Sequence, residues 1–350
     1  MIYNKYTLKE LATIRYGKNQ KNVVSLDGSF PIYGTGGLMG YASKYLYDKP
    51  SVLIGRKGTI DKVRYVTHPF WTVDTLFYTE INDAIVLPHF LYYVLSLLDL
   101  RKYNEGTSIP SLRTETLNRL ELYIPPLSEQ KKILSFIEPI EEKIDINSRI
   151  NRNLSEQLKV IFSKMFPTIA DNGSNTLEEI ISFSNGKKRP DTEGKVPVYG
   201  GNGILSYTDK SNAENCVIIG RVGAYCGSLY LSIEPCWISD NAIKAEAKNS
   251  KSQMFIYYLL QELALSNRHI GTSQPLLTQG ILNAIPFTCP SEEGIISFCK
   301  KANDIQKLID MNTIENKRLS ELRDTLLPKL MSGELDVSLS LIHISEPTRP

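Results

Sequence analysis

The chain has 350 residues, of which 42% are hydrophobic and 22% charged, and this is the profile of a soluble globular protein of about two domains. The net charge is only +2, so the chain is not strongly basic, and its charge alone does not indicate nucleic-acid binding. The longest apolar stretch, Ala84–Leu100, is broken by Pro88 and His89 and is too short to span a bilayer. The N-terminus has no apolar signal region, so we expect no membrane association and a cytoplasmic location.

The five cysteines all lie in the second half of the chain, at Cys216, Cys226, Cys236, Cys289 and Cys299. An odd number without a CxxC pair argues against a disulfide framework and against a zinc site. We expect buried free thiols in strands. The four histidines show no HExxH or other ligand spacing, so we expect no metal site.

A shift of about 165 residues aligns the sequence with itself, which is the signature of a repeat. Six blocks match in the same order: Leu8–Lys18 with Leu177–Lys187, Pro31–Tyr41 with Pro197–Tyr207, Leu53–Thr59 with Ile218–Ala224, Trp71 and Asp74 with Trp237 and Asp240, Phe90–Leu98 with Phe255–Leu263, and Gly106–Leu112 with Gly271–Leu277. The sequence therefore predicts a tandem duplication that folds as two similar lobes.

Each copy has the same predicted elements. An amphipathic, helix-like start runs to Gly17 or Gly186, a candidate helix C-cap. Short β-branched and aromatic runs follow, separated by turn residues, and predict strands. One helix is predicted at Phe90–Leu100 and at Phe255–Leu265, and the last strand of the first copy ends at Pro125-Pro126. This order is typical of an α+β lobe.

A long helix is predicted after each lobe. Ser128 is the candidate N-cap of the first, with Glu129 and Gln130 in its first turn. Apolar residues then recur at alternating steps of three and four, which indicates a coiled-coil seam in helices of about 35–38 residues, roughly 50–57 Å long. The residues predicted to pair the helices are Ile137, Ile140, Ile144, Asn147, Asn151 and Leu154 in the first, and Ile305, Ile309, Asn312, Asn316 and Leu319 in the second.

The two asparagine pairs occupy equivalent places in the two helices. A buried asparagine in a seam lowers stability but selects register and partner. We therefore expect an antiparallel pairing in which the asparagine pairs meet at the centre. The alternative is that these side chains lie at the solvent edge of the seam.

The sequence lacks the common catalytic signatures: it has no Walker A motif, no GxSxG motif and no cofactor loop of a methyltransferase. The glycines of Tyr33–Gly40 change in the copy, which favours turn glycines over a phosphate-binding loop. Pro190–Lys195 superficially matches a PD…ExK nuclease pattern. Its carboxylates, Asp191 and Glu193, are only two residues apart, and the first copy lacks them, so we interpret the segment as a polar loop.

The order of lobe, long helix, lobe and long helix resembles the specificity subunit of type I restriction–modification systems. The supporting strings are PIYGTGG with its copy PVYGGNG, IGRKG with IGRVG, the GTSxPxL loops, IPPLSEQKKI and LLPKLMSGELDV, and the resemblance covers Thr7–Val337. Small departures are Ser-Glu-Glu for Ser-Glu-Gln in the second copy and Arg323 where Leu158 stands in the first helix.

The resemblance implies two target recognition domains that each read one half of a split double-stranded DNA target. It also implies that the helices set the spacing and dock two modification (methyltransferase) subunits, which restriction subunits join. The chain itself is then non-catalytic and has no cofactor of its own. The predicted boundaries are recognition domain 1–126, spacer helix 127–168, recognition domain 169–290, spacer helix 291–332 and tail 333–350, with the lobes related by a pseudo-twofold axis.

Cations and hydroxyls near the glycine-rich turns are the candidate DNA contacts. They are Lys18, Lys21, Arg56, Lys57, Lys62, Arg64, Thr107 and Ser108 in the first lobe, and Lys187, Lys188, Arg189, Lys195, Arg221, Thr272 and Ser273 in the second. The repeated Arg56 and Arg221 are the foremost candidates, although each could instead pair with Asp74 or Asp240 inside its lobe. The Thr-Ser loops could likewise only cap a turn.

Two other hypotheses stay open. The first is a detached recognition module of a fused restriction–methylation enzyme, or an unrecognised nuclease; the second is a scaffold that does not bind DNA. Tyr92-Tyr93 and Tyr257-Tyr258 are expected to pack in their helices rather than stack on bases. The tail segment Leu339–Arg349 resembles the translation of a sequencing-library adapter. We expect it to be disordered or artefactual and the native C-terminus to be missing.

Overall fold

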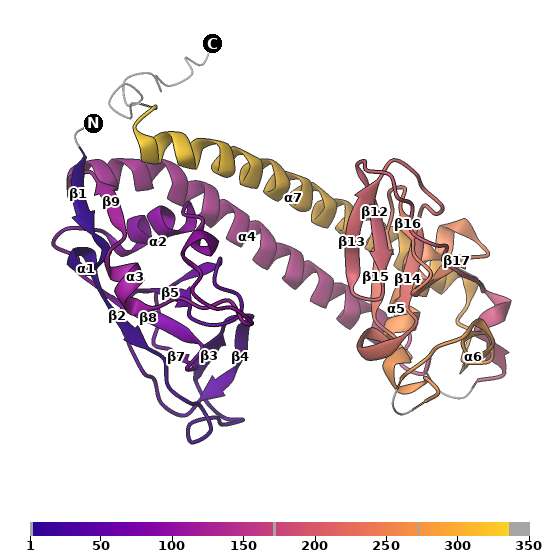
Figure 1. Cartoon of the computed structure of the whole chain (residues 1–350). Helices are drawn as coiled ribbons and strands as arrows, with labels where there is room; N and C mark the ends of the chain where they lie inside the picture. The colour runs from indigo at the N-terminus through magenta and orange to yellow at the C-terminus, as the bar shows by residue number, and fades with distance from the viewer. Residues whose placement is uncertain (1–2, 171–172, 272–273, 336–350) are drawn as a thin grey trace, which may run out of the picture. The chain divides into compact units, whose positions relative to one another are not determined.

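Residues 3–170, 173–271 and 274–335 are described by a computed structural model of the chain. Two units emerge, one formed by residues 1–145 with 316–350 and the other by residues 146–315. Each unit thus holds one sequence copy together with a part of each long helix (Figure 1). The tail segment Leu339–Arg349, about which the sequence made a prediction, lies outside the described residues.

The first unit contains two sheets and a two-stranded ribbon. The four-stranded sheet has the order β2-β8-β5-β6, the three-stranded sheet has the order β4-β3-β7, and β1 pairs with β9. The bounds are β1 Asn4–Thr7, α1 Leu8–Leu11, β2 Ala12–Tyr16, β3 Phe30–Gly34, β4 Gly37–Ala42, β5 Ser51–Gly55, β6 Val63–Val66, β7 Trp71–Thr72, β8 Leu76–Ile81, α2 Pro88–Ser96, the 3-10 helix η1 Leu100–Tyr103, α3 Thr114–Asn118 and β9 Glu121–Ile124.

The second unit repeats this plan with the same strand connections. Its sheets have the orders β11-β17-β14-β15 and β13-β12-β16, and β10 pairs with β18. The bounds are β10 Asn175–Thr176, η2 Leu177–Glu179, β11 Ile181–Asn185, β12 Val196–Gly200, β13 Gly203–Thr208, β14 Cys216–Gly220, η3 Gly223–Tyr225, β15 Leu229–Ser232, β16 Trp237–Ile238, β17 Ala242–Ala247, η4 Ser250–Ser252, α5 Gln253–Glu262, η5 Leu265–Asn267, α6 Gln279–Asn283 and β18 Pro286–Phe287. The predicted α+β lobes and their duplication are confirmed.

The prediction that each copy starts with an amphipathic helix is wrong. Only one turn is helical, closed by a capping box in which the Thr7 amide donates to Glu10 (2.6 Å) and the Thr176 amide to Glu179 (2.8 Å). The chain then continues as β2 or β11, because a neighbouring strand supplies hydrogen bonds along its whole length.

Gly17 and Gly186 are consequently strand-end residues and not helix caps. A β-carbon at either position would lie 2.0 Å from a main-chain carbonyl oxygen, that of Val73 or of Ser239. Glycine is required here because two backbone segments approach closely.

The thiol prediction holds only in part. Cys216 is buried in β14, and Cys226, Cys236 and Cys299 are buried outside strands. Cys289 is exposed, because it lies in the short segment between β18 and the last helix.

The long helices are α4, Leu127–Met165, and α7, Glu292–Ser332, about 58 and 62 Å long at 1.5 Å per residue. The first begins one residue before the predicted cap Ser128, whereas at the second the Ser291 Oγ accepts from the Gly294 amide (3.3 Å). Both helices accommodate an internal proline, Pro139 and Pro328.

In each unit the two helices are antiparallel. In the first unit the Asn316 amide donates to the Ile144 carbonyl (3.2 Å), and Arg323 lies 3.7 Å from Glu141. Residue numbers therefore rise along α4 as they fall along α7, and the same holds in the second unit. The predicted antiparallel pairing is confirmed, while the pseudo-twofold relation between lobes stays a prediction.

The seam asparagines lie between the helices rather than at their solvent edge. Asn147 is 1% exposed and donates to Glu315 (2.7 Å). Asn312 donates to the Asn151 Oδ1 (2.8 Å), and Asn151 donates to the Ile309 carbonyl (3.1 Å). Asn151 and Asn312 therefore form a direct asparagine pair between the helices.

Of the predicted apolar seam residues, Ile137 is fully buried. The others are half-buried: Ile140, Ile144, Leu154, Ile305, Ile309 and Leu319.

The Asn151→Ala substitution should reduce the free energy of unfolding by about 1–3 kcal/mol, because it leaves the Asn312 amide without its acceptor inside the helix pair. Urea denaturation followed by circular dichroism measures this loss. The control is Asn153→Ala, an exposed position on the same helix, which should change stability by no more than about 0.5 kcal/mol. Equal effects of the two substitutions would contradict the role of Asn151.

Each lobe is fastened to its segments of the long helices by a common apolar core. In the first unit Phe90 and Phe77 share a buried cluster with Ile133 of α4 and Leu327 of α7. In the second unit the corresponding cluster is built around phenylalanines, among them Phe162, Phe255 and Phe298. The helices are therefore part of the core of each unit.

Candidate nucleic-acid interface

Several strands of the first unit end or begin at one edge. β2 and β5 are both antiparallel to β8, so they run in the same direction and end at the same side. β6 is antiparallel to β5 and begins there, with Val63 opposite Ile54. The end of β3 lies at the same edge. The Val73 amide donates to the Tyr33 carbonyl of β3 (3.0 Å), and the Lys18 amide donates to the Thr72 carbonyl (2.8 Å).

Cations predicted from the sequence gather at this edge, and we call the group the first basic corner. Its members are Lys18, Arg56, Lys57, Lys62 and Arg64. All except Arg56 are exposed. Lys21 is also exposed, three residues beyond Lys18, in the turn where the Val23 amide donates to the Gln20 carbonyl.

The predicted Thr-Ser loop joins this corner. The Gly58 amide donates to the Pro110 carbonyl (2.8 Å), and the Leu112 amide donates to the Arg56 carbonyl (2.9 Å). Thr107 and Ser108 lie in this loop and are exposed. The structure thus brings together segments that are 50 residues apart in the sequence.

Arg56 is half-buried and held on two sides. Its Nη1 donates to the main-chain carbonyl of Asp74 (2.8 Å), and its guanidinium lies 5.1 Å from the centre of the Tyr16 ring. The alternative in which Arg56 pairs inside the lobe is therefore realised through the Asp74 backbone. The same contacts orient the guanidinium at the corner.

The second unit repeats the corner with its own cations, which we call the second basic corner: Lys187, Lys188, Arg189 and Arg221. β11 and β14 are both antiparallel to β17 and end together. The Leu277 amide donates to the Arg221 carbonyl (2.9 Å), as Leu112 does to Arg56. The Arg221 Nε is buried and has no hydrogen-bond partner among the described residues.

Three predicted contacts of the second lobe are not among the residues that form this corner. Thr272 and Ser273 lie outside the described residues. Lys195 is exposed directly before β12, at the end of the strand away from Tyr199, whose carbonyl accepts from the Ser239 amide near the corner.

The two tryptophans fix the backbone of Lys18 and Lys187, the first cation of each corner. The sequence did not suggest this role. The Trp71 Nε1 donates to the Lys18 carbonyl (2.8 Å) and the Trp237 Nε1 to the Lys187 carbonyl (3.3 Å). The signal was present in the repeat, where Trp71 and Trp237 align. Tyr93 and Tyr258 are buried, in agreement with the expectation that they pack.

The Pro190–Lys195 segment forms an irregular, largely exposed loop, and Asp191 and Glu193 line a pocket together with Arg189 and Tyr207. No group of three or more His, Cys, Asp or Glu side chains that could hold a metal ion occurs in the part of the chain that the structure describes. The geometry offers carboxylates beside a cation and no assembled metal centre among these residues.

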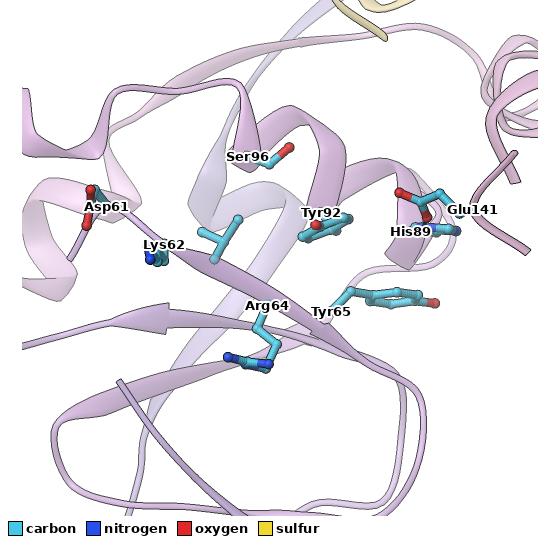
Figure 2. Close-up of a pocket in the computed structure, with 9 residues that line it drawn as sticks. Asp61, Lys62, Arg64, Tyr65, His89, Tyr92, Ser96 and Glu141 are labelled. Atoms are coloured by element: carbon cyan, nitrogen blue, oxygen red, sulfur yellow. Dashed lines mark ion pairs between the residues drawn. The ribbon is translucent and has the colours of Figure 1, made fainter. Parts of the chain in front are cut away.

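A further polar cluster lies where the first lobe meets α4, beside a pocket of about 540 Å³ (Figure 2). The His89 Nδ1 lies 2.9 Å from Glu138 and its Nε2 lies 3.3 Å from Glu141. The Tyr65 ring of β6 stacks on the imidazole at 4.7 Å between ring centres. Arg323 of α7 completes the cluster at Glu141.

The charges of this cluster support one another. Burial alone would lower the pKa of His89, but hydrogen bonds and charge from Glu141 and Glu138 outweigh burial and raise it. For Glu141, burial would raise the pKa, yet His89 and Arg323 hold it below its usual range. The imidazolium form of His89 is therefore favoured and links lobe and helices.

The second lobe has no such cluster at the equivalent place, although its helices pack on it in the same way. With the shift of 165, His89 corresponds to Met254, Arg323 to Leu158 and Glu141 to Gln306. Met254 and Leu158 are buried in the phenylalanine-rich core. The two lobes are therefore attached to the helices by different chemistry.

The chain belongs to the type I restriction modification DNA specificity domain family, whose model matches residues 3–156 and 171–323. The match covers each sequence copy once, together with most of the following helix. The resemblance inferred from the repeat is confirmed. Specificity subunits of type I restriction systems are, as a class, non-catalytic.

Named relatives agree with this family. The specificity subunit of type I restriction enzyme HindI from Haemophilus influenzae is 24% identical, over 73% of this chain and 79% of the relative. The MjaVIII specificity subunit from Methanocaldococcus jannaschii is 20% identical, over 93% and 91%. A crystal structure of the S subunit of a type I restriction–modification system from M. genitalium has the same fold, with a TM-score of 0.61, 21% identity and coverage of 94% and 96%.

Among the described residues, no helix is both long and apolar enough to cross a bilayer.

Proposed function

We propose that the first and second basic corners each bind one half of a two-part double-stranded DNA target. The observation that carries this is the repeated corner: the same strand ends, glycine-flanked arginine and loop carbonyl contacts occur in both units. Two similar lobes suit two half-sites. Exposed lysines neutralise phosphates, which position a protein on DNA, while base contacts specify the sequence.

The two helices, in this proposal, set the distance between half-sites and dock two modification subunits, which restriction subunits then join. Exposed apolar side chains on α7 support a docking role. Leu308, Met311 and Ile314 recur at steps of three and are 50%, 65% and 53% exposed. Exposed apolar rows of this kind mark protein-binding surfaces. The chain then contributes no cofactor and no chemistry of its own.

Methylome sequencing of a host that expresses this chain with a cognate modification subunit tests the proposal. We expect a two-part motif with a methylated adenine in each part and a fixed gap. A continuous motif, or no motif in a host where the subunit pair is produced, would overturn it.

The runner-up is a detached recognition module of a fused restriction–methylation enzyme, or an unrecognised nuclease. Methylation or cleavage of DNA by the purified chain alone would favour it. A scaffold that does not bind DNA predicts weak affinity with little salt dependence. Both outcomes differ from the sequence-selective, salt-dependent binding expected of a specificity subunit.

Replacing one exposed lysine in each corner, Lys57→Gln with Lys188→Gln, should weaken DNA binding for all sequences. The slope of log affinity against log salt should fall by about one for each lost phosphate contact. Fluorescence anisotropy at several salt concentrations measures both quantities. The matched control is Lys49→Gln, since Lys49 is exposed at the opposite end of β5. A slope that changes equally in the control would remove the corners from the interface.

A further inference from the structure

Each lobe displays the same exposed apolar hairpin. On β4 of the first unit, Leu38, Met39 and Tyr41 are 55%, 60% and 46% exposed. The equivalent residues on β13 of the second unit are Ile204, Leu205 and Tyr207, at 48%, 47% and 54%. Apolar side chains exposed at three equivalent places in both copies indicate a contact surface rather than chance.

A β-bulge explains how two consecutive residues become exposed. The register shifts between Ile32 and Tyr33 in the β3–β4 hairpin, and between Val198 and Tyr199 in the β12–β13 hairpin. Bulges re-aim side chains next to functional sites. Both copies therefore carry a bulge at the same place in the hairpin.

In each copy the second of the two consecutive apolar side chains lies against a glycine of the preceding strand. A β-carbon on Gly34 would lie 2.3 Å from the Met39 sulfur, and one on Gly200 would lie 2.6 Å from the Leu205 Cδ1. Met39 and Leu205 therefore lie across the end of the preceding strand, in the space beside a glycine.

The hairpin turns touch the basic corners. A β-carbon on Gly37 would lie 3.2 Å from the Arg64 Nη2, and one on Gly201 would lie 3.6 Å from the Gly220 Cα, directly before Arg221. Arg64 also lies over the Tyr33 ring of the first hairpin, 5.6 Å from its centre. Each apolar hairpin thus begins beside an arginine of its basic corner, Arg64 in the first lobe and Arg221 in the second.

We propose that these hairpins enter a groove of the DNA and that residues 38 and 39 of the first lobe, and 204 and 205 of the second, contact base edges. This inference rests on the proposed function. A two-stranded ribbon fits the major groove, and apolar side chains there recognise the thymine methyl group. The cations of the adjoining corner favour DNA over a protein as the occupant, because they lie where phosphates would flank the ribbon.

The hairpins also supply a source of different half-site sequences. The first lobe presents leucine and methionine where the second presents isoleucine and leucine. Side chains of different shape at one place in the same scaffold make different apolar contacts. The two lobes would then select different bases at equivalent positions of their half-sites.

The test is the double substitution Leu38→Ser with Met39→Ser, in the chain co-expressed with its modification subunit. Discrimination between the target and its single-base variants in the first half-site should fall about tenfold or more, while the salt slope stays unchanged. Discrimination in the second half-site should be unaffected. A second variant, Leu38→Ile with Met39→Leu, carries the second lobe's residues and should keep affinity while its preferred bases change.

Tyr123→Ser is the control, because Tyr123 is 61% exposed on β9, a strand outside both sheets of the lobe. Unchanged discrimination in the Ser double variant would overturn the inference. Loss of the modification subunit with DNA preference intact would show that the hairpin docks protein and would also overturn it. If the unsubstituted complex shows no two-part preference, the proposed function fails instead.

Discussion

Phe162→Ala should lower the free energy of unfolding of the second unit by about 3–5 kcal/mol, which is the cost of removing a large aromatic side chain from a core. Phe162 of α4 is fully buried, and its ring centre lies 5.1 Å from that of Phe298 on α7 and 5.7 Å from that of Phe255 on α5. One side chain therefore joins the lobe to both helices. Its loss leaves a cavity at that joint.

Urea unfolding monitored by hydrogen exchange resolves the effect by region. Protection should fall in α5 and in the adjoining parts of α4 and α7, while the first unit keeps its stability. Val160→Ala is the control, since Val160 is 53% exposed two residues away and should change stability by less than about 0.5 kcal/mol. A loss below 1 kcal/mol for Phe162→Ala, in the same range as the control, would show that the rings do not secure the second lobe.

His89→Met, which installs the residue of the second lobe, should remove a pH dependence that only the first unit has. The pKa of His89 is raised in the folded chain, so its contribution to stability is complete below the unfolded value of about 6.5 and is lost as pH rises through the raised folded value. We expect a loss of about 1–3 kcal/mol at pH 6 and much less above the folded pKa. The groups facing His89 are Glu138, Glu141, Tyr65, Tyr92, Tyr93 and, through Glu141, Arg323.

The carboxylate side of the cluster acts at lower pH. Because the pKa of Glu141 is lowered by folding, its contribution is present above the ordinary glutamate value and disappears as pH falls through the folded value. The attachment of the first lobe is therefore strongest in the interval between the two titrations, under mildly acidic conditions.

Hydrogen exchange of α2 and β6 from pH 5 to 9 follows this attachment. The unsubstituted chain should lose protection there as pH rises through the raised pKa of His89, and His89→Met should show no such trend. His68→Gln serves as control, because the partner of His68 is the Tyr33 hydroxyl (3.1 Å) and not a carboxylate. A pH trend that persists in His89→Met would assign it to another group.

Sequence reasoning succeeded where a pattern repeats over many residues. The heptad steps through Ile137, Ile144, Ile305 and Ile309 identified both long helices within a few residues of their ends, because a 3.5-residue period is unambiguous over ten turns. The helix-like start before Gly17 was misread, because four residues of helix and five of strand are too short for either period to dominate.

Residue types alone determined that this chain is a duplicated α+β protein with two antiparallel helices and a cation in a glycine-flanked turn of each lobe. Only the tertiary structure decided that Lys18, Arg56 and the Thr107–Ser108 loop share one corner, since strand direction and loop hydrogen bonds unite segments far apart in the chain. It likewise decided that His89 faces Glu138 and Glu141, whereas the equivalent Met254 is packed among phenylalanines. The physical reason is that periodicity is a local property, while the partner of a polar side chain depends on which distant element packs against it.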